Sequence, residues 1–409
     1  MQLKFSSFWL FCLLLGLFIS TPANNANSAH PDQPQSDLIW GWDIAFGQGG
    51  VEAFATGDGY ANDIAFQQTY RMPDGAILAG IESWQYGRFS QQFYEVVRFT
   101  EGGSVADQLI FYNDLTMQLV GVQSDGGFIL RQYDDYPFLT RYWSDFTPDT
   151  SFGPNGEVRL PDGAYFLSIQ PDDKIIGAVR GGNLFRLNPD GSADGGFPSD
   201  FGPFAELSAL VADGQSNLLI ADVDDSYMRC SARVYSQDGA LLGTVYDTVS
   251  WQPDNFCFPG VFIPYPQGGF VWSWGGERIF KINLDSSPDL SFGDEGMVEL
   301  DQSLAEEIFP EFLYLAIGSE GQVYFTGSMY ICGAGHPLVG GFDQFGQPDP
   351  NFGSQGYLHF NQAVDEVGAI FALPDGKLLL VGVDDPNYLL MRLMEYPVRA
   401  RMYLPWVIR

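Results

Sequence analysis

Phe371-Ala372-Leu373-Pro374-Asp375-Gly376-Lys377-Leu378-Leu379-Leu380-Val381-Gly382 reads as two apolar strands joined by a Pro-Asp-Gly turn. Proline, aspartate and glycine favour the tight connection of a β-hairpin. Six related turns centre on Asp74-Gly75, Asp125-Gly126, Asp172-Asp173, Asp213-Gly214, Gln267-Gly268 and Glu320-Gly321. Seven turns spaced about 50 residues apart predict an array of stacked supersecondary units.

A second motif, Asp-x-x-Phe-Gly-x-x-Gly, precedes a short apolar strand. Clear copies begin at Asp43, Asp149, Asp289 and Asp349, and a degenerate copy begins at Asp194. Glycines at fixed offsets suit a turn that needs positive φ, and the Phe can pack beneath it. No helical pattern follows any copy, which argues against a phosphate-binding loop.

A third motif is an apolar strand that carries one cation and runs into an Asp-Gly turn, as in Phe185-Arg186-Leu187-Asn188-Pro189-Asp190-Gly191. Its cations are Arg98, Arg141, Arg186, Arg233, Lys281 and Arg392, while Gly341 marks the unit that lacks one. Recurrence at one strand position indicates a structural role. We therefore predict an ion pair in each unit, such as Arg186 with Asp194.

The order Asp-x-Ser-Phe-Gly-x-x-Gly, Pro-Asp-Gly-Lys and Arg-Leu-Asn-Pro-Asp-Gly-Ser resembles the delta-60 repeat of secreted bacterial proteins. The resemblance covers most of residues 43–393 and is strongest at 149–194 and 349–393. It implies a β-propeller-like array. The family carries no general catalytic site that could be transferred to this chain.

Seven units of four short strands predict an all-β fold, a seven-bladed β-propeller over residues 37–393. The alternative is an open β repeat array, which would need polar capping repeats at both ends. Both terminal units keep the motifs, which favours closure. The last unit lacks a fourth strand, so we predict that Val51–Ala55 supplies it, antiparallel to Tyr388–Leu393.

The two ends of the chain differ from the repeats. Lys4, the apolar run Phe8–Ile19 and the small polar stretch after it are typical of a cleaved signal peptide over residues 1–29, which predicts secretion. The apolar run is shorter than the roughly 20 residues of a membrane span. Residues 394–409 form a basic tail, interpreted as an edge strand, a sorting signal, a docking peptide or a segment packed on the acidic body.

A formal charge of −32 argues against nucleic acids and anionic membranes as partners. Three histidines and the absence of nucleophile-elbow, Walker and zinc-protease motifs argue against the corresponding catalytic classes. We expect a monomeric, non-enzymatic binding or scaffold propeller. The alternative is a carbohydrate-active enzyme, a glycoside hydrolase or lyase that uses carboxylates at the channel mouth.

Variable loops on a rigid scaffold are the expected binding surface. Its candidate residues are Trp84, Tyr86, Asp134, Asp135, Asp224, Asp225, Trp274, Asp384 and Asp385. Aromatic faces beside polar groups stack on sugars or contact a protein partner, and oxygen-rich loops bind Ca²⁺. No loop has the full spacing of a Ca²⁺ motif, and the alternative is that these residues are solvated turns. No other cofactor is expected.

Three cysteines remain after removal of the leader that contains Cys12. In an exported chain thiols tend to pair. Cys230 and Cys257 are expected on the same face of the propeller, and we predict a disulfide between them, with Cys332 left over.

Overall fold

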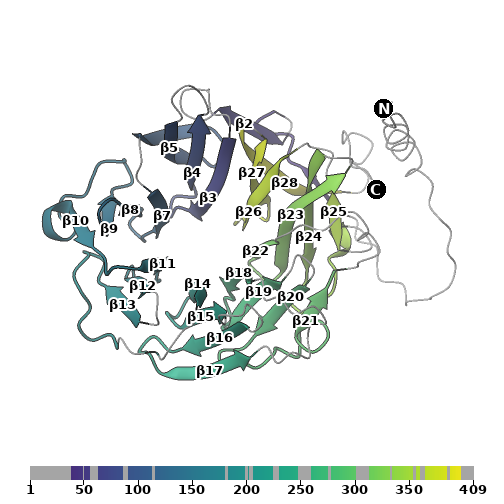
Figure 1. Ribbon diagram of the computed structural model, residues 1–409. Helices are drawn as coiled ribbons and strands as arrows, with labels where there is room; N and C mark the ends of the chain where they lie inside the picture. Colours follow the sequence, from purple (N-terminus) through teal and green to yellow (C-terminus); the bar gives the residue numbers. More distant parts are fainter. Residues whose placement is uncertain are drawn as a thin grey trace, which may run out of the picture.

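The structure is a computed structural model. It describes residues 38–48, 50–55, 63–85, 91–112, 116–179, 183–198, 201, 206–223, 230–246, 259–274, 278–300, 313–331, 334–352, 356–359, 364–384 and 387–397. Within these residues the chain forms seven antiparallel sheets arranged in a closed ring (Figure 1). We call these sheets blades 1 to 7 in chain order.

The first six blades take their strands consecutively from the chain. Blade 1 contains β3 (Asp63–Arg71), β4 (Ile77–Gln85), β5 (Gln91–Phe99) and β6 (Val105–Tyr112). Blade 2 contains β7 (Thr116–Val122), β8 (Phe128–Tyr133), β9 (Pro137–Tyr142) and β10 (Glu157–Arg159), preceded by the short helix η1 (Pro154–Gly156). Blade 3 shows β11 (Ala164–Ile169), β12 (Ile175–Val179) and β13 (Asn183–Leu187) among the described residues.

Blades 4 to 6 have the same order. Blade 4 contains β14 (Glu206–Ala212), β15 (Leu218–Val223), β16 (Cys230–Tyr235) and β17 (Leu241–Tyr246). Blade 5 contains β18 (Pro259–Pro264), β19 (Phe270–Trp274), β20 (Arg278–Ile282) and β21 (Met297–Glu299). Blade 6 contains β22 (Tyr314–Ile317), β23 (Val323–Ile331), β24 (Ala334–Phe342), the short helix η4 (Pro350–Phe352) and β25 (Tyr357–His359).

Blade 7 joins the two ends of the repeat region. Its strands β26 (Glu366–Ala372), β27 (Leu378–Asp384) and β28 (Asn387–Pro397) are completed by β2 (Val51–Ala55), which pairs antiparallel with β28 from Val51 opposite Met391 to Ala55 opposite Asn387. The predicted closing strand is therefore confirmed. A further strand, β1 (Leu38–Trp42), pairs with residues 393–397, so β28 extends beyond the predicted end at Leu393.

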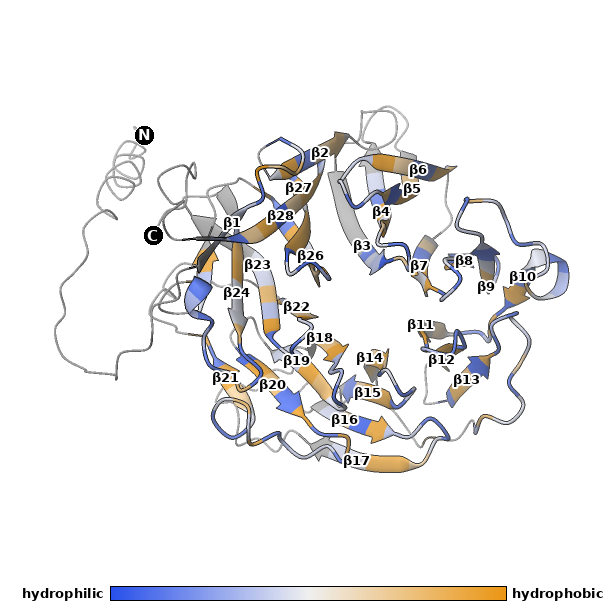
Figure 2. Ribbon diagram, turned by 180° about the vertical axis from the view of Figure 1, so that it is seen from behind, coloured by the Kyte–Doolittle hydropathy of each residue, from blue (hydrophilic) through white to orange (hydrophobic). Residues whose placement is uncertain are grey.

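The hydrophobic core lies between the blades. Seven clusters of buried apolar residues each join one blade to the next, and the cluster containing Phe46, Ile77 and Tyr388 joins blade 7 to blade 1. Apolar segments run along the strands of the blades (Figure 2). Because every blade packs on two neighbours, the apolar core continues around the ring.

The first and second strands of each blade are joined by a hairpin turn, which lies at the predicted position in every blade except blade 4. In blade 1 the Gly75 N–H donates to the Met72 carbonyl (3.0 Å), and Gly75 takes the positive φ of 89° that favours glycine. In blade 4 the equivalent residue is Ser216 (φ 63°), and Asp213 is the first residue of the turn. The prediction that Asp213-Gly214 forms the turn centre was wrong by two residues.

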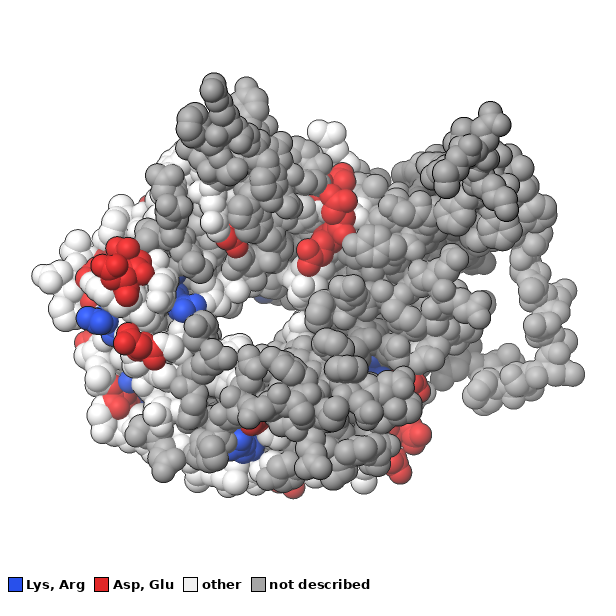
Figure 3. All heavy atoms as spheres, in the orientation of Figure 1, with Lys and Arg blue, Asp and Glu red and all other residues white. Residues whose placement is uncertain are grey.

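The innermost strands surround an opening that stays visible when all atoms are drawn (Figure 3). In six blades the innermost strand has a register shift against its partner, in β3, β7, β11, β14, β18 and β26. Such bulges bend a strand and increase its twist. We call the side with the first-to-second and third-to-fourth strand connections the turn face, and the opposite side the loop face.

Candidate functional site

An ion-pair module is repeated at the turn face. In blade 3 the Arg186 Nε donates to Asp194 Oδ2 (2.8 Å), while the Asp194 N–H donates to the Arg186 carbonyl (2.9 Å). The other carboxylate oxygen of Asp194 accepts from the Gly196 N–H (3.2 Å), and the guanidinium lies 4.2 Å from the centre of the Phe197 ring. This confirms the predicted pair. It also explains why cation, Asp and Phe recur at fixed spacing.

Three other blades contain the same module. The corresponding pairs are Arg141–Asp149 (2.6 Å), Lys281–Asp289 (2.9 Å) and Arg392–Asp43 (2.9 Å). The last pair connects β28 to the turn between β1 and β2, and the Arg392 guanidinium lies 4.4 Å from the centre of the buried Phe46 ring. Ring closure therefore uses the same contacts as the individual repeats.

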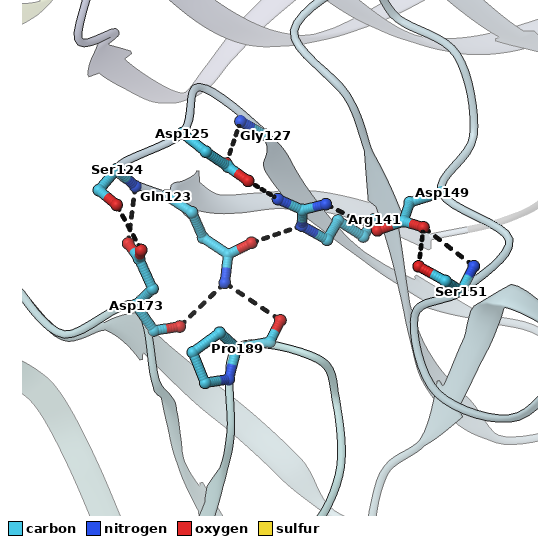
Figure 4. A network of polar contacts seen from close by, with 9 residues as sticks. All are labelled: Gln123, Ser124, Asp125, Gly127, Arg141, Asp149, Ser151, Asp173 and Pro189. Atoms are coloured by element: carbon cyan, nitrogen blue, oxygen red, sulfur yellow. Dashed lines mark hydrogen bonds and ion pairs between the residues drawn. The ribbon is translucent and has the colours of Figure 1, made fainter.

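Arg141 has the most extensive set of partners (Figure 4). Its side chain is 6% exposed and that of Asp149 is 7% exposed. It also pairs with Asp125, and its Nε donates to Gln123 Oε1 (2.6 Å). The Gln123 amide in turn donates to the Asp173 carbonyl (2.9 Å) in blade 3. The network thus links two blades.

Cations of this series also contact the following blade directly. Donor and acceptor pairs are Arg98 with the Ser144 carbonyl (3.4 Å), Arg186 with the Gln237 carbonyl (3.0 Å) and Arg392 with the Glu101 carbonyl (3.0 Å). Each acceptor lies in the turn after the third strand of the next blade. For Arg392 in blade 7, the next blade around the ring is blade 1. These cations serve the scaffold, in agreement with the structural role expected of them.

Arg233 does not occupy the predicted position. The turn after β16 begins at Ser236, whereas the turn after β13 begins at Asn188, so Val234 is the equivalent of Arg186. Successive side chains of a strand point to opposite faces, and a shift of one residue moves Arg233 to the other face of the blade. There it pairs with Asp222 on β15 (3.1 Å).

The module carboxylates have shifted pKa values. Burial raises the pKa of Asp149, but the hydrogen bonds from Ser151 and Arg141 and the charge of Arg141 outweigh this effect and lower it. The same balance of burial against hydrogen bonds and a nearby cation lowers the pKa of Asp43, Asp194 and Asp289. These groups stay ionised well into acidic solution.

We expect the modules to lose their contribution to stability only below about pH 4, the usual pKa range of Asp. A carboxylate whose pKa is lowered by folding stabilises the folded state above its unfolded pKa, and this stabilisation is lost as pH falls through the folded pKa. Urea unfolding of the wild type and of Asp149→Asn from pH 3 to pH 7 checks this. The free-energy difference between them should shrink below pH 4; a difference that does not change with pH would contradict the assignment.

On the loop face, the connection between β8 and β9 is one described part of the predicted binding surface. Asp134 and Asp135 are exposed there, beside Tyr133, which is 47% exposed. The Arg159 guanidinium lies 4.2 Å from the centre of the Tyr136 ring and fixes that aromatic next to the acids. Aromatic and carboxylate groups therefore lie next to one another at the surface of this connection.

Most other predicted site residues lie outside the described residues, namely Tyr86, Asp224, Asp225, Asp385 and Cys257. Trp84 lies in β4, Trp274 ends β19 and Cys230 begins β16, but the side chains of these three are outside the described part. The Cys230–Cys257 disulfide and the wider loop surface remain predictions.

Asp384 lies at the loop-face end of β27, close to two acids at the start of β26 that the sequence analysis missed. Burial raises the pKa of Asp384, and the charge of Asp365 adds to the rise. The Asp365 N–H donates to the Val383 carbonyl (2.7 Å), which places the two acids together. The adjacent Glu366 pairs in register with Val383. Burial raises the pKa of Tyr314 to about 12, and the nearby Glu366 adds to the rise.

Two observations concern only the described part of the chain. None of its helices has the length and apolarity needed to cross a membrane. Its His, Cys, Asp and Glu residues include no group of three or more arranged to hold a metal ion.

Comparison with known families supports a propeller repeat. The family model described as "Domain of unknown function (DUF5122) beta-propeller" matches residues 170–197, which run from the hairpin turn of blade 3 to Phe197 of its module. The chain is a seven-bladed β-propeller. No curated protein sequence matches the propeller significantly.

Solved structures similar to the propeller have low sequence identity. A protein of unknown function from Bacteroides caccae is 12% identical over 68% of this chain and 94% of its own, with a TM-score of 0.40. BamB from Moraxella catarrhalis is 12% identical over 82% of this chain and 99% of its own, with a TM-score of 0.41. The C-terminal WD40 domain of Sif2 is 13% identical over 80% of this chain and 81% of its own, with a TM-score of 0.44.

Proposed function

We propose that this protein is a secreted, non-enzymatic propeller that binds an extracellular glycan or surface protein through its loop face. Ca²⁺ is a candidate ligand of the acidic loops there. The N-terminal leader pattern and the resemblance to the delta-60 repeat support secretion. The resemblance to that repeat supports a scaffold without its own catalytic centre.

The observation that carries the proposal is the difference between the two faces. On the turn face, hydrogen bonds and ion pairs hold the connections in one repeated conformation. On the loop face, the connections differ in length and sequence from blade to blade. Surfaces with variable loops on a rigid scaffold are where binding usually lies.

The cluster Tyr133-Asp134-Asp135-Tyr136 is the best-defined part of this surface. Tyrosine offers an apolar ring and a polar hydroxyl, which suits stacking on a sugar or packing in a protein interface. The neighbouring carboxylates accept hydrogen bonds from sugar hydroxyls or from a basic partner. Because it lies in the short connection between β8 and β9, it is the first target for mutation.

The test is a glycan array and a pull-down from surface extracts, both with the mature chain and both with Ca²⁺ or a chelator. The triple variant Tyr133→Ala/Asp134→Asn/Asp135→Asn is expected to lose at least tenfold in affinity, since each lost hot-spot contact is worth about 1–2 kcal/mol. A matched control, Phe345→Ala/Asp238→Asn, removes an exposed aromatic and an acid from the turn face. Equal losses in both variants, or no binding by the wild type, would contradict the proposal.

A carbohydrate-active enzyme is the second candidate, favoured by the pair Asp365 and Asp384. A carboxyl group whose pKa is raised by burial and a neighbouring acid can act as a general acid beside a second carboxyl group. Release of reducing sugar from a polysaccharide by the wild type, lost in Asp384→Asn, would support this candidate over the first.

A further inference from the structure

The sixth blade lacks the module cation, and a side chain from another blade occupies the corresponding place. Gly341 stands where the other modules have Arg or Lys, and a Cβ there would lie 2.9 Å from Tyr324 and 3.0 Å from Phe352. The rest of the module is kept, since the Asp349 N–H donates to the Gly341 carbonyl (2.9 Å) and Phe352 is fully buried. The Asp349 carboxylate therefore lacks its usual partner.

Trp40 of β1 covers the Phe352 ring. The two rings are stacked with centres 5.0 Å apart and planes 12° apart, and Trp40 also meets the Tyr324 ring edge-on at 5.9 Å. In blades 3 and 7 a guanidinium lies over the equivalent Phe ring. An indole thus replaces a cation at this position, and Trp40 is 1% exposed.

The contact brings two carboxylates together without a cation. Trp40 pairs in register with Glu395 on β28, so their side chains share one face of blade 7. Glu395 accepts from the Asn351 side-chain amide (2.8 Å) in η4, two residues after Asp349. Among the described residues, neither Asp349 nor Glu395 forms an ion pair, in contrast to Asp43, which pairs with both Lys377 (3.1 Å) and Arg392.

The other charged or titratable groups that act on these two carboxylates are two acids and a tyrosine, so they do not neutralise the negative charge. The turn after β24 contributes Asp343, the hairpin turn before β23 contributes Glu320, and β23 contributes Tyr324. Burial raises the pKa of Asp349 and Asp343 adds to the rise, and together they outweigh the lowering by hydrogen bonds from the Asn351 N–H and the Trp40 side chain. Burial also raises the pKa of Glu395, with Asp349 as a further cause.

We propose that β1 is a latch whose docking on blade 6 depends on pH, tight when Asp349 and Glu395 carry a proton and weaker when both are ionised. A carboxyl group whose pKa is higher in the docked state than in the undocked state stabilises docking while it is protonated. This stabilisation is lost as the pH rises through the pKa of the docked state. Undocking exposes Phe352 and the edge of β28 at residues 393–397, to which β1 is paired.

The experiment measures hydrogen exchange of the β1 amides in the full chain at pH 4.5 and pH 7.5, expressed as protection factors that correct for intrinsic exchange. Protection of β1 is expected to fall by about tenfold at the higher pH, because the two carboxyl groups, whose pKa values are raised in the docked state, lose their protons between these pH values. Protection of β8, in blade 2, should stay constant over this range.

Two variants decide the cause. Asp349→Asn/Glu395→Gln should keep β1 protected at both pH values, and Glu395→Gln alone should show about half of the logarithmic effect. The control Glu157→Gln removes an exposed acid on β10 and should behave as the wild type. The proposal is overturned if wild-type β1 is equally protected at both pH values, if the double variant keeps the pH effect, or if β8 loses protection together with β1.

Discussion

Removing residues 37–56 is expected to abolish cooperative folding of the whole ring, not merely to shorten one blade. The deletion takes both β1 and β2 from β28 and removes Asp43 from Arg392. It also removes Trp40 and Phe46 from two of the clusters between blades. Truncating one buried large aromatic side chain costs about 3–5 kcal/mol, and a whole protein is stable by only about 5–15 kcal/mol.

Differential scanning calorimetry and near-UV circular dichroism check this expectation. The deleted chain should show no sharp transition and little tertiary signal. A synthetic peptide of residues 37–56 added in excess should restore the transition, and a matched peptide with Trp40→Ala and Phe46→Ala should not. A deleted chain that unfolds as sharply and at the same temperature as the wild type would refute the closure mechanism.

Replacing Arg141 by Met is expected to destabilise the propeller by about 3–5 kcal/mol, the usual effect of removing one partner of a buried ion pair. The Met side chain keeps an apolar stem but leaves Asp149 ionised in a buried place, and it frees Gln123, which links blades 2 and 3. Urea unfolding at pH 7 measures the difference.

Arg98→Met is the matched control at the same strand position in blade 1. Arg98 is 22% exposed and its partners Asp74 and Asp107 are about half exposed. Ion pairs in such places contribute about 0–1 kcal/mol, so this variant should be only slightly destabilised. Adding Asp149→Asn to Arg141→Met should recover part of the loss. Similar losses in both single variants would show that burial does not set the strength of the module.

The fold was predictable because its signals are local and repeated. A hairpin turn such as Pro374-Asp375-Gly376 determines its own conformation, and the spacing of Arg186 and Asp194 places them in one module. The closing strand Val51–Ala55 followed from counting strands per unit. Blade 4 was predicted less accurately because Asp213 stands at the first position of a turn of the usual length, and Arg233 stands one residue before the repeated cation position.

The candidate sites were less predictable because they depend on contacts between distant segments. The absence of a cation at Gly341 was visible in the sequence, but its replacement by Trp40 was not, since β1 carries none of the repeated motifs. The proximity of Asp384 to Asp365 depends on the hairpin of β26 and β27 rather than on a motif. Carboxylates that meet in this way leave no local signature.

The pair Arg392–Asp43 has a consequence for how the chain is made. Its residues are 349 positions apart, so the first strands to leave the ribosome wait for the last ones before they can pair. At synthesis rates of about 5–20 residues per second, that wait is roughly 20 to 70 seconds. Unpaired strand edges are prone to aggregate during such an interval. The Asp and Gly turns between strands and the high negative charge would keep the growing chain apart from its neighbours until the ring can close.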